Sequence, residues 1–207
     1  TESIRKGGSI EDAVKKCMAL LKGSYSVVML FDGDLYAFRD PHGIRPLCFG
    51  RTDDGYIVAS ESVAVDTLNG RYERDVNPGE MIHITGDEIR FKQIAVAPQK
   101  GHCVFEYIYF ARADSYIDGA LVYDVRRKIG AKIFEESPVQ ADAVCTVPDS
   151  GTAYAVGFSE ISSIPFMECL IKNRYMGRTF IMPTQKKREN AVRIKLNPIP
   201  DHIRDKS

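Results

Sequence analysis

The sequence has no C-x-x-C motif and no other closely spaced pair of cysteines. Its five cysteines lie far apart along the chain, at Cys17, Cys48, Cys103, Cys145 and Cys169. A structural zinc site or a disulfide framework needs cysteines at close and regular spacing, so this distribution argues against both. We therefore expect reduced thiols and a cytoplasmic protein.

The sequence also lacks long apolar runs and an excess of charge of either sign. No run approaches the roughly 20 residues that a membrane-spanning helix needs, and the N-terminal stretch TESIRKGGSIED has no apolar core like that of a signal peptide. The 28 basic and 28 acidic residues give a formal net charge of zero. The chain as a whole therefore has no electrostatic attraction to nucleic acid, and we predict neither nucleic acid nor a membrane as its partner.

Positive charge is instead concentrated in one stretch, Leu170–Leu196. This basic segment has a single acid and eight basic residues, which are Lys172, Arg174, Arg178, Lys186, Lys187, Arg188, Arg193 and Lys195. Gly177 and Pro183 interrupt it, so we predict a long loop that follows a buried strand, Phe166–Ile171. Such a loop can be a lid over a phosphorylated, strongly anionic ligand. A solvated basic loop without a ligand is the alternative, and charge alone does not separate the two.

The first part of the chain predicts one helix packed on mainly antiparallel strands. Ser9 and Asp12 form a capping box at the start of a helical apolar pattern that Gly23 ends. Asp32-Gly33 between two apolar runs predicts a β-hairpin. Further strands are predicted at residues 47–50, 56–60, 80–85 and 88–94, with a short helix at residues 62–68.

The pattern changes after a predicted linker at residues 96–102. Residues 122–136 and 153–162 predict helices, and residues 143–147 and 166–171 predict strands. This order predicts a parallel α/β unit, so we expect one domain over residues 1–95 and another over residues 103–207. Ligands of such sheets bind at the carboxyl ends of strands. The basic segment and the motif Pro148–Thr152 (PDSGT) both lie there, so we expect them to share one site.

Two short motifs carry candidate chemistry. PDSGT offers hydroxyl groups and backbone N–H groups just before a helix, which suits a phosphate or a hydrated Mg²⁺. The same residue types commonly form only a cap and a turn. RDPHGIRPL (Arg39–Leu47) is interpreted as a rigid turn held by an Arg–Asp pair. His42 and His102 have no neighbouring ligand-type residues, so we predict that neither is catalytic.

Several motifs resemble known enzymes. RDPHGIRPL, VASES (58–62) and NPGEMIHI (77–84) resemble class II glutamine amidotransferases, which are N-terminal-nucleophile hydrolases. CVFEYIYFARADS (103–115), VPDSG (147–151) and LIKNRYMGRTFIMP (170–183) are narrower and resemble the amidophosphoribosyltransferase family, the glutamine phosphoribosylpyrophosphate amidotransferases. The resemblance implies a mixed α+β and α/β fold. The C-terminal part of a class II glutaminase domain would precede the first part of a phosphoribosyltransferase α/β domain.

The resemblance implies a glutamine-dependent glycosyltransferase at the first step of de novo purine synthesis. One domain would release ammonia from glutamine, and the other would use it to displace pyrophosphate from phosphoribosyl pyrophosphate, giving 5-phosphoribosylamine. Mg²⁺ is the implied cofactor, purine nucleotides are possible feedback inhibitors, and a homo-oligomer is expected. The family pattern implies that Tyr175, Arg178 and Lys195 contact phosphoribosyl pyrophosphate.

The family pattern also implies roles for residues outside this contact set. Tyr107, Phe180 and Ile181 would line an apolar ammonia channel, and Ser150 matches a Mg²⁺ position. Cys103 matches one ligand of the 4Fe-4S cluster that some members carry, although such a cluster needs four ligands. No catalytic residue is assigned within the chain.

The sequence departs from the family pattern at both ends. The family's nucleophilic cysteine and its paired-aspartate phosphoribosyl loop have no counterpart in these residues. We therefore expect an internal fragment that is inactive by itself. Two alternatives remain: a nucleic-acid-binding module built on residues 172–195, or another class II glutamine amidotransferase with a different acceptor domain.

Overall fold

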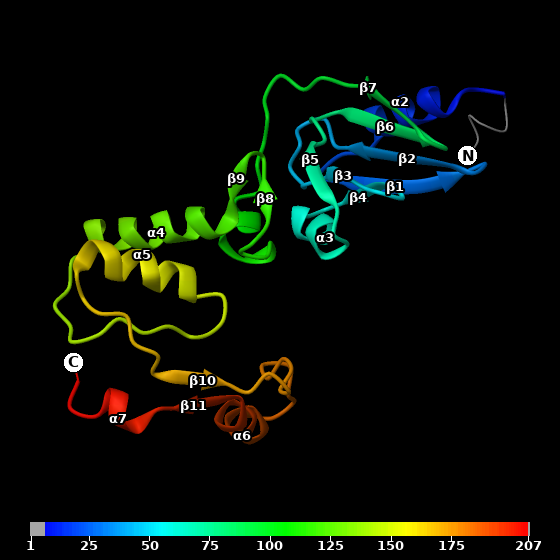
Figure 1. Cartoon of the computed structure of the whole chain (residues 1–207). Helices are drawn as coiled ribbons and strands as arrows, with labels where there is room; N and C mark the ends of the chain where they lie inside the picture. Colours follow the sequence, from blue (N-terminus) through cyan, green and yellow to red (C-terminus); the bar gives the residue numbers. More distant parts are fainter. Residues whose placement is uncertain (1–6, 207) are drawn as a thin grey trace. The chain divides into compact units, whose positions relative to one another are not determined.

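The structure, a computed structural model, describes residues 7–206. Contacts divide the chain into two compact units, Thr1–Val122 and Tyr123–Ser207. Figure 1 shows the elements of each unit. Within residues 7–206, no helix has both the length and the apolar character needed to cross a bilayer. The domain boundary at residues 96–102 stays a prediction, and contacts group residues 103–122 with the first unit.

The first unit is built on a four-stranded antiparallel sheet with the order β1-β2-β6-β7. Its strands are β1 (Ser26–Phe31), β2 (Asp34–Arg39), β6 (Glu80–Thr85) and β7 (Glu88–Gln93). The β1–β2 hairpin turns at Asp32 and Gly33, whose φ angles are 52° and 86°. Two consecutive positive φ angles are what a tight hairpin turn requires, and the predicted hairpin is confirmed.

Helix α2 (Ile10–Leu20) covers one face of this sheet. Its N-cap is Ser9, whose Oγ accepts the N–H of Asp12 at 3.1 Å, as the predicted capping box requires. Val14 and Met18 of the helix are buried against three residues of the sheet, Tyr36, Phe38 and Met81. The helical apolar pattern of the sequence therefore marks the face that the sheet covers.

A three-stranded sheet with the order β4-β3-β5 contributes to the second core cluster. Its strands are β3 (Cys48–Thr52), β4 (Gly55–Ala59) and β5 (Arg71–Asp75), and the helix α3 (Ser62–Thr67) lies between β4 and β5 in the chain. Residues from both sheets are buried together, namely Ala37, Leu47, Phe49, Val76 and Ile82. The strand β5 was not predicted, because its residues RYERD are mostly charged and give no apolar alternation.

The last part of the first unit contains a π-helical turn and a small hairpin. The turn η1 spans Glu106–Phe110, and β8 (Tyr116–Ile117) pairs with β9 (Ala120–Leu121). Ala111, Ile117 and Val122 form a small buried cluster here.

The second unit is organised around two helices in close contact, α4 (Val122–Glu136) and α5 (Thr152–Ser162). A Cβ added at Gly130 would lie 1.9 Å from the carbonyl oxygen of Tyr154, and one added at Gly157 would lie 1.8 Å from that of Arg127. The two backbones therefore approach so closely that only glycine fits at either position.

Three predictions for the second unit need correction. Residues 143–147 and 166–171 do not form a two-stranded parallel ladder, since one isolated parallel bridge, Val144 to Phe166, joins them. The strand at the end of the second range is β10 (Leu170–Lys172), which pairs antiparallel with β11 (Leu196–Pro198).

The basic segment is not a continuous loop, because it contains the helix α6 (Gln185–Lys195). Its residues favour a helix by propensity and by the Thr184 cap, but they lack the apolar stripe on which the prediction relied. The short helix α7 (Pro200–Ile203) follows β11.

Candidate functional site

The PDSGT motif and the basic segment meet in the second unit. Lys172, the last residue of β10, donates a hydrogen bond from Nζ to Oδ2 of Asp149 at 2.6 Å. The Lys172 side chain is about one-quarter exposed, whereas that of Asp149 is largely exposed. The two segments that the sequence placed at strand ends thus lie side by side.

The PDSGT motif leads directly into α5. Gly151 is the N-cap, and no side chain caps this helix end. A Cβ at Gly151 would lie 2.1 Å from Oγ1 of Thr146 and 3.0 Å from the carbonyl oxygen of Val147, so a larger residue would fit here only if the Thr146 side chain moved. The Ser150 side chain is exposed beside this helix end. N–H groups at an uncapped helix N-terminus attract anions, and a phosphate can approach them here.

The basic segment leaves the β10–β11 pair and returns to it. The N–H of Asn173 donates to the carbonyl oxygen of Lys195 at 2.7 Å, which closes the base of the segment. Lys195 Nζ donates to the carbonyl oxygen of Gly177 at 3.0 Å. Arg188 Nη1 donates to the carbonyl oxygen of Met182 at 2.9 Å. The Lys195 and Arg188 side chains therefore hold the backbone of the segment in place through hydrogen bonds to its own carbonyl oxygens.

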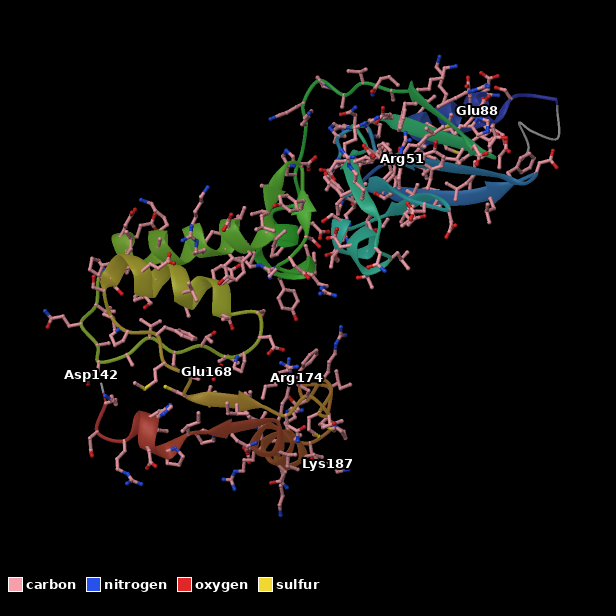
Figure 2. The ribbon with its side chains drawn as sticks, in the orientation of Figure 1. Arg51, Glu88, Asp142, Glu168, Arg174 and Lys187 are labelled. Carbon is pink, nitrogen blue, oxygen red and sulfur yellow. The ribbon has the colours of Figure 1, made fainter. Side chains whose placement is uncertain are left out.

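Other cations of the segment face solvent. Arg174 and Lys187 project from the loop and from α6 (Figure 2). The Arg178 side chain is exposed, and Tyr175 is 99% exposed. A cavity of about 450 Å³ lies along α6, lined by Thr179, Phe180, Gln185, Arg188, Glu189, Val192 and Arg193. The segment combines exposed positive charge with a partly apolar hollow.

The predicted site residues are distributed over both units. Tyr175, Arg178, Phe180, Ile181, Lys195 and Ser150 belong to the second unit, whereas Tyr107 and Cys103 belong to the first. Phe180 and Ile181 are mostly exposed. Tyr107 donates from its hydroxyl to the carbonyl oxygen of Ile117 at 2.9 Å.

The surroundings suit a Mg²⁺ ion at Asp149 and Ser150 better than an iron–sulfur cluster at Cys103. Mg²⁺ commonly binds through one or two protein oxygens while substrate phosphates and waters complete its shell, and the Asp149 carboxylate with the Ser150 hydroxyl fits that pattern. Within residues 7–206, no three His, Cys, Asp or Glu side chains gather as a metal-binding group. Cys103 therefore has no partners there for an iron–sulfur cluster, which takes four ligands.

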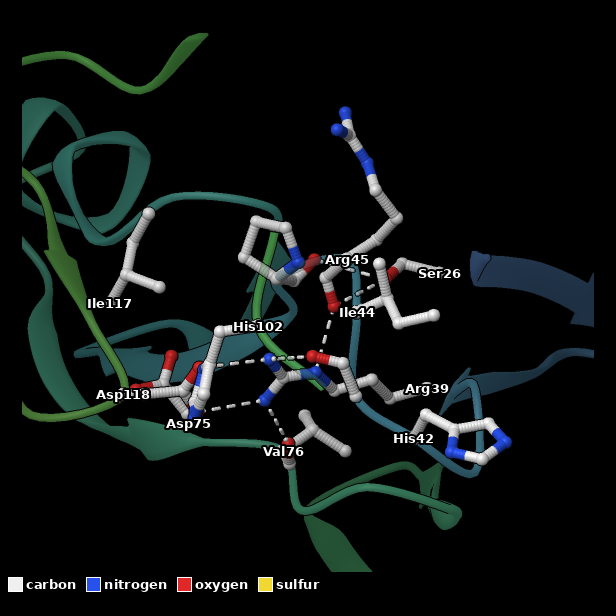
Figure 3. A network of polar contacts seen from close by, with 12 residues as sticks. Ser26, Arg39, His42, Ile44, Arg45, Asp75, Val76, His102, Ile117 and Asp118 are labelled. Atoms are coloured by element: carbon white, nitrogen blue, oxygen red, sulfur yellow. Dashed lines mark hydrogen bonds and ion pairs between the residues drawn. The ribbon is translucent and has the colours of Figure 1, made fainter. Parts of the chain in front are cut away.

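Arg39 in the first unit shows what the RDPHGIRPL turn does (Figure 3). Its guanidinium is 2% exposed and pairs with both carboxylate oxygens of Asp118 at 3.1 Å. It also donates to the carbonyl oxygens of Gly43, Arg45 and Val76 at 2.8, 2.7 and 2.9 Å. The predicted rigid turn is present, and the aspartate that pairs with Arg39 comes from a distant part of the chain.

The carboxylates of Asp40 and Asp118 support this turn and its surroundings. The Asp40 carboxylate accepts the N–H groups of His42 and Ile44 at 3.0 and 3.2 Å, which fixes the turn from inside. Burial opposes the charge of Asp118, but hydrogen bonds and charges from Arg39 and His102 prevail and lower the pKa of this carboxyl. This network is a structural support, because all five guanidinium hydrogen bonds end on the protein itself.

Sequence reasoning missed the Lys172–Asp149 contact. In the sequence, Lys172 is one of the eight basic residues of the basic segment, and Asp149 belongs to the PDSGT turn motif. Lys172 and Asp149 both follow predicted strands that were expected to be neighbours. Their opposite charges at adjacent strand ends were therefore the feature from which the contact could have been predicted.

Comparisons with known proteins agree with this architecture. The family model of the glutamine amidotransferase domain matches residues 2–67. The amidophosphoribosyltransferase of Archaeoglobus fulgidus is 49% identical over 197 residues, which cover 95% of this chain and 43% of that protein. The enzyme of the same name from Methanothermobacter thermautotrophicus is 50% identical over 194 residues, covering 94% of this chain and 41% of that protein.

A solved structure gives the same relation in three dimensions. The glutamine phosphoribosylpyrophosphate amidotransferase from B. subtilis, complexed with ADP and GMP, superimposes with a TM-score of 0.87 at 40% identity, over 96% of this chain and 44% of that one. Residues 2–67, within the first unit, thus match the glutamine amidotransferase domain. Over nearly its whole length, the chain is a homologue of the amidophosphoribosyltransferases, and it spans about two fifths of the length of these relatives. The family resemblance and the mixed fold class are confirmed.

Proposed function

We propose that this chain forms part of an amidophosphoribosyltransferase, which makes 5-phosphoribosylamine from glutamine and phosphoribosyl pyrophosphate. The observation that carries the proposal is identity of 49% and 50% to two enzymes of that name over 95% and 94% of this chain. The contact between Lys172 and Asp149 supports it, because it brings a basic segment to an uncapped helix N-terminus. Purine synthesis and a cytoplasmic location belong to the same proposal.

The second unit would bind phosphoribosyl pyrophosphate with Mg²⁺. Asp149 and Ser150 would share the metal with the substrate phosphates, and the helix N-terminus would take up further negative charge. Tyr175, Arg178 and Lys195 would contact the substrate from the basic segment. Cations placed over the departing pyrophosphate stabilise the charge that develops on it. Bound Mg²⁺ supplies the same kind of stabilisation.

The ammonia channel and the partners are further parts of the proposal. Tyr107, Phe180 and Ile181 are the proposed apolar lining, since an apolar passage keeps ammonia neutral. Purine nucleotides are proposed feedback inhibitors, which agrees with the B. subtilis relative solved with ADP and GMP. A homo-oligomer is also proposed. An iron–sulfur cluster at Cys103 would require ligands from outside residues 7–206.

The 207-residue chain allows a direct test of substrate binding. We expect isothermal titration calorimetry to detect Mg²⁺-dependent binding of phosphoribosyl pyrophosphate. Arg178→Ala should weaken it about tenfold, the effect of losing one charge-assisted contact, and Lys195→Ala should do the same. Lys128→Ala is the matched control, because Lys128 is an exposed cation on α4 outside the site. Equal affinity for all four proteins would contradict the assignment.

The same material tests activity and the nucleic-acid alternative. We expect no glutamate release from glutamine by these residues alone, and release above the blank would contradict the expected inactivity. A nucleic-acid module would bind oligonucleotides with a strong dependence on salt and lose binding when Lys186, Lys187 and Arg188 become alanine. No oligonucleotide binding at low salt is the expected result.

A further inference from the structure

Two cysteines of the second unit, 24 positions apart in the sequence, bring their thiols into contact in the fold. A side-chain hydrogen bond joins Cys169 to Cys145, and both are free thiols in this structure. Their distance along the chain is too long for a C-x-x-C motif, so no spacing pattern indicated the pair. Neither cysteine belongs to the substrate contacts, the metal positions or the channel lining proposed above.

Backbone hydrogen bonds hold the two segments that carry these thiols. Val144, the residue before Cys145, donates its N–H to the carbonyl oxygen of Pro165 at 2.9 Å. The carbonyl oxygen of Val144 accepts the N–H of Met167 at 2.9 Å, and together these bonds form the isolated parallel bridge. The Cys169 thiol donates to the carbonyl oxygen of Met167 at 3.6 Å. The contact between the thiols is therefore fixed by the framework of the second unit.

The two thiols differ in their access to solvent. Cys145 is exposed and lines a cavity of about 450 Å³ that residues of α4 and α5 also line, whereas Cys169 is 5% exposed. Burial raises the pKa of the Cys169 thiol, the hydrogen bond with Cys145 raises it further, and the charge of Lys206 opposes the rise. A small oxidant can therefore reach Cys145 directly, while Cys169 is kept beside it as a protonated thiol.

We propose that Cys145 and Cys169 form a modification site, at which a peroxide such as hydrogen peroxide produces a disulfide between them. The Cys145 thiolate attacks one peroxide oxygen and the O–O bond breaks, so that Cys145 becomes a sulfenic acid. The released hydroxide takes up the proton that the Cys145 thiol lost and becomes water. The Cys169 sulfur then attacks the Cys145 sulfur, the S–O bond breaks, and the departing hydroxide takes the Cys169 proton to form a second water. The two thiols lose two electrons, and these reduce the peroxide to two waters.

Other chemistry fits the pair less well. Within residues 7–206, no group of three His, Cys, Asp or Glu side chains is placed to hold a metal ion, so the two thiols have no third ligand of these types. A disulfide in a reducing compartment is usually transient and serves catalysis or redox sensing. Redox-sensing cysteines are accessible and often have a second cysteine beside them, which converts the sulfenic acid to a disulfide before further oxidation. One exposed and one buried thiol in contact match that arrangement.

The disulfide would join two segments that lead to the proposed substrate site. Cys145 lies four residues before Asp149, and Cys169 lies three residues before Lys172. The new bond would therefore cross-link the segments whose ends form the Lys172–Asp149 contact. The oxidation itself needs no phosphoribosyl pyrophosphate, so its test is separate from that of the proposed function.

Peptide mapping of the 207-residue chain by mass spectrometry tests the proposal. The reduced protein is treated with hydrogen peroxide in the presence of a chelator, and the remaining thiols are alkylated with N-ethylmaleimide in denaturant. We expect the loss of two hydrogen atoms per chain, a cross-link between the peptides of Cys145 and Cys169, and recovery of both thiols with dithiothreitol. Oxidation that stops at a sulfenic or sulfinic acid on Cys145, with Cys169 still free, would overturn the proposal. Disulfides that join Cys145 mainly to Cys17 or to a second copy of the chain would also overturn it.

Two serine variants separate the roles of the two thiols. Cys169→Ser should prevent the cross-link but keep Cys145 reactive, so dimedone should trap severalfold more sulfenic acid than in the native chain. Cys145→Ser should leave Cys169 free under the same treatment, because Cys169 is buried. The matched control is Cys17→Ser, since Cys17 is an exposed thiol on α2 of the first unit, and the cross-link should form in this variant as in the native chain. Equal dimedone labelling of the native chain and of Cys169→Ser would contradict the assignment of Cys169 as the second thiol.

Discussion

Replacing Arg39 by lysine tests whether the buried network of the first unit depends on guanidinium geometry or on charge alone. Arg39 donates five hydrogen bonds, to three carbonyl oxygens and to both carboxylate oxygens of Asp118. Lysine keeps the charge but has one nitrogen, which cannot reach acceptors on different sides of the planar group. If the ammonium stays with Asp118, at least two buried carbonyl groups lose their donors.

The expected cost follows from those lost donors. A buried polar group left without a partner costs about 1–3 kcal/mol, so two of them predict a loss of about 2–6 kcal/mol in the free energy of unfolding. That is a large share of the roughly 5–15 kcal/mol that stabilises a typical domain. We expect Arg39→Lys to fold only marginally, although its net charge is unchanged.

Urea unfolding and hydrogen exchange measure this cost. Circular dichroism gives the unfolding midpoint, and exchange monitored by mass spectrometry should show the largest loss of protection in peptides that contain residues 40–47 and 115–121. Arg71→Lys is the matched control, since Arg71 is an exposed residue of the same unit on β5, and it should change stability by less than about 0.5 kcal/mol. Equal midpoints for the two variants would refute the argument from geometry.

Three other predictions concern single residues. Gly130→Ala should gain about 1 kcal/mol of helix propensity, but collision of the new Cβ with the backbone of α5 should give a net loss of about 1–3 kcal/mol in the free energy of unfolding. Thermal unfolding followed by circular dichroism at 222 nm should therefore show a lower midpoint. A midpoint above that of the control Lys128→Ala would contradict the close approach of the two helices. The pKa of Asp118 is lowered in the folded state, so its charge stabilises the fold at pH values above its unfolded pKa of 3.8, and this stabilisation is lost as pH falls through the folded pKa. The difference in free energy of unfolding between the native chain and Asp118→Asn should therefore become smaller over that acidic range. A difference that stays constant with pH would contradict this assignment. Thr184→Ala removes a cap of about 0.5–2 kcal/mol, so the α6 amides should exchange faster, while Thr184→Ser should keep them protected.

Patterns that depend on neighbours in the chain predicted the first unit well. The Ser9 capping box and the Asp32-Gly33 hairpin are local, and the structure has both. β5 was missed because its stability comes from pairing with β3 and not from its own apolar residues. The pairing of Arg39 with Asp118 joins residues far apart in the sequence, and no local signal marks it.

The site of the second unit was predicted in part. Its two segments were expected to meet from their positions after strands, and the Lys172–Asp149 contact joins them. The helix α6 was missed because nearly all its residues are polar and its apolar stripe is absent, with Ala191 as its buried residue. The contact between Cys145 and Cys169 was not predicted, because it depends on the register that the Val144–Phe166 bridge sets.

The closed base of the basic segment has a consequence for evolution. Lys172 and Leu196 are paired residues of β10 and β11, so the residues between them form a segment that leaves the strand pair and returns to it at the same position. The entropy of closing a loop grows only with the logarithm of its length, and doubling the length costs about 0.6 kcal/mol. The β10–β11 pair should therefore tolerate insertions and deletions between these two residues, provided that they fall outside the proposed substrate contacts. The segment can change its length while the β10–β11 pair that holds its two ends stays the same.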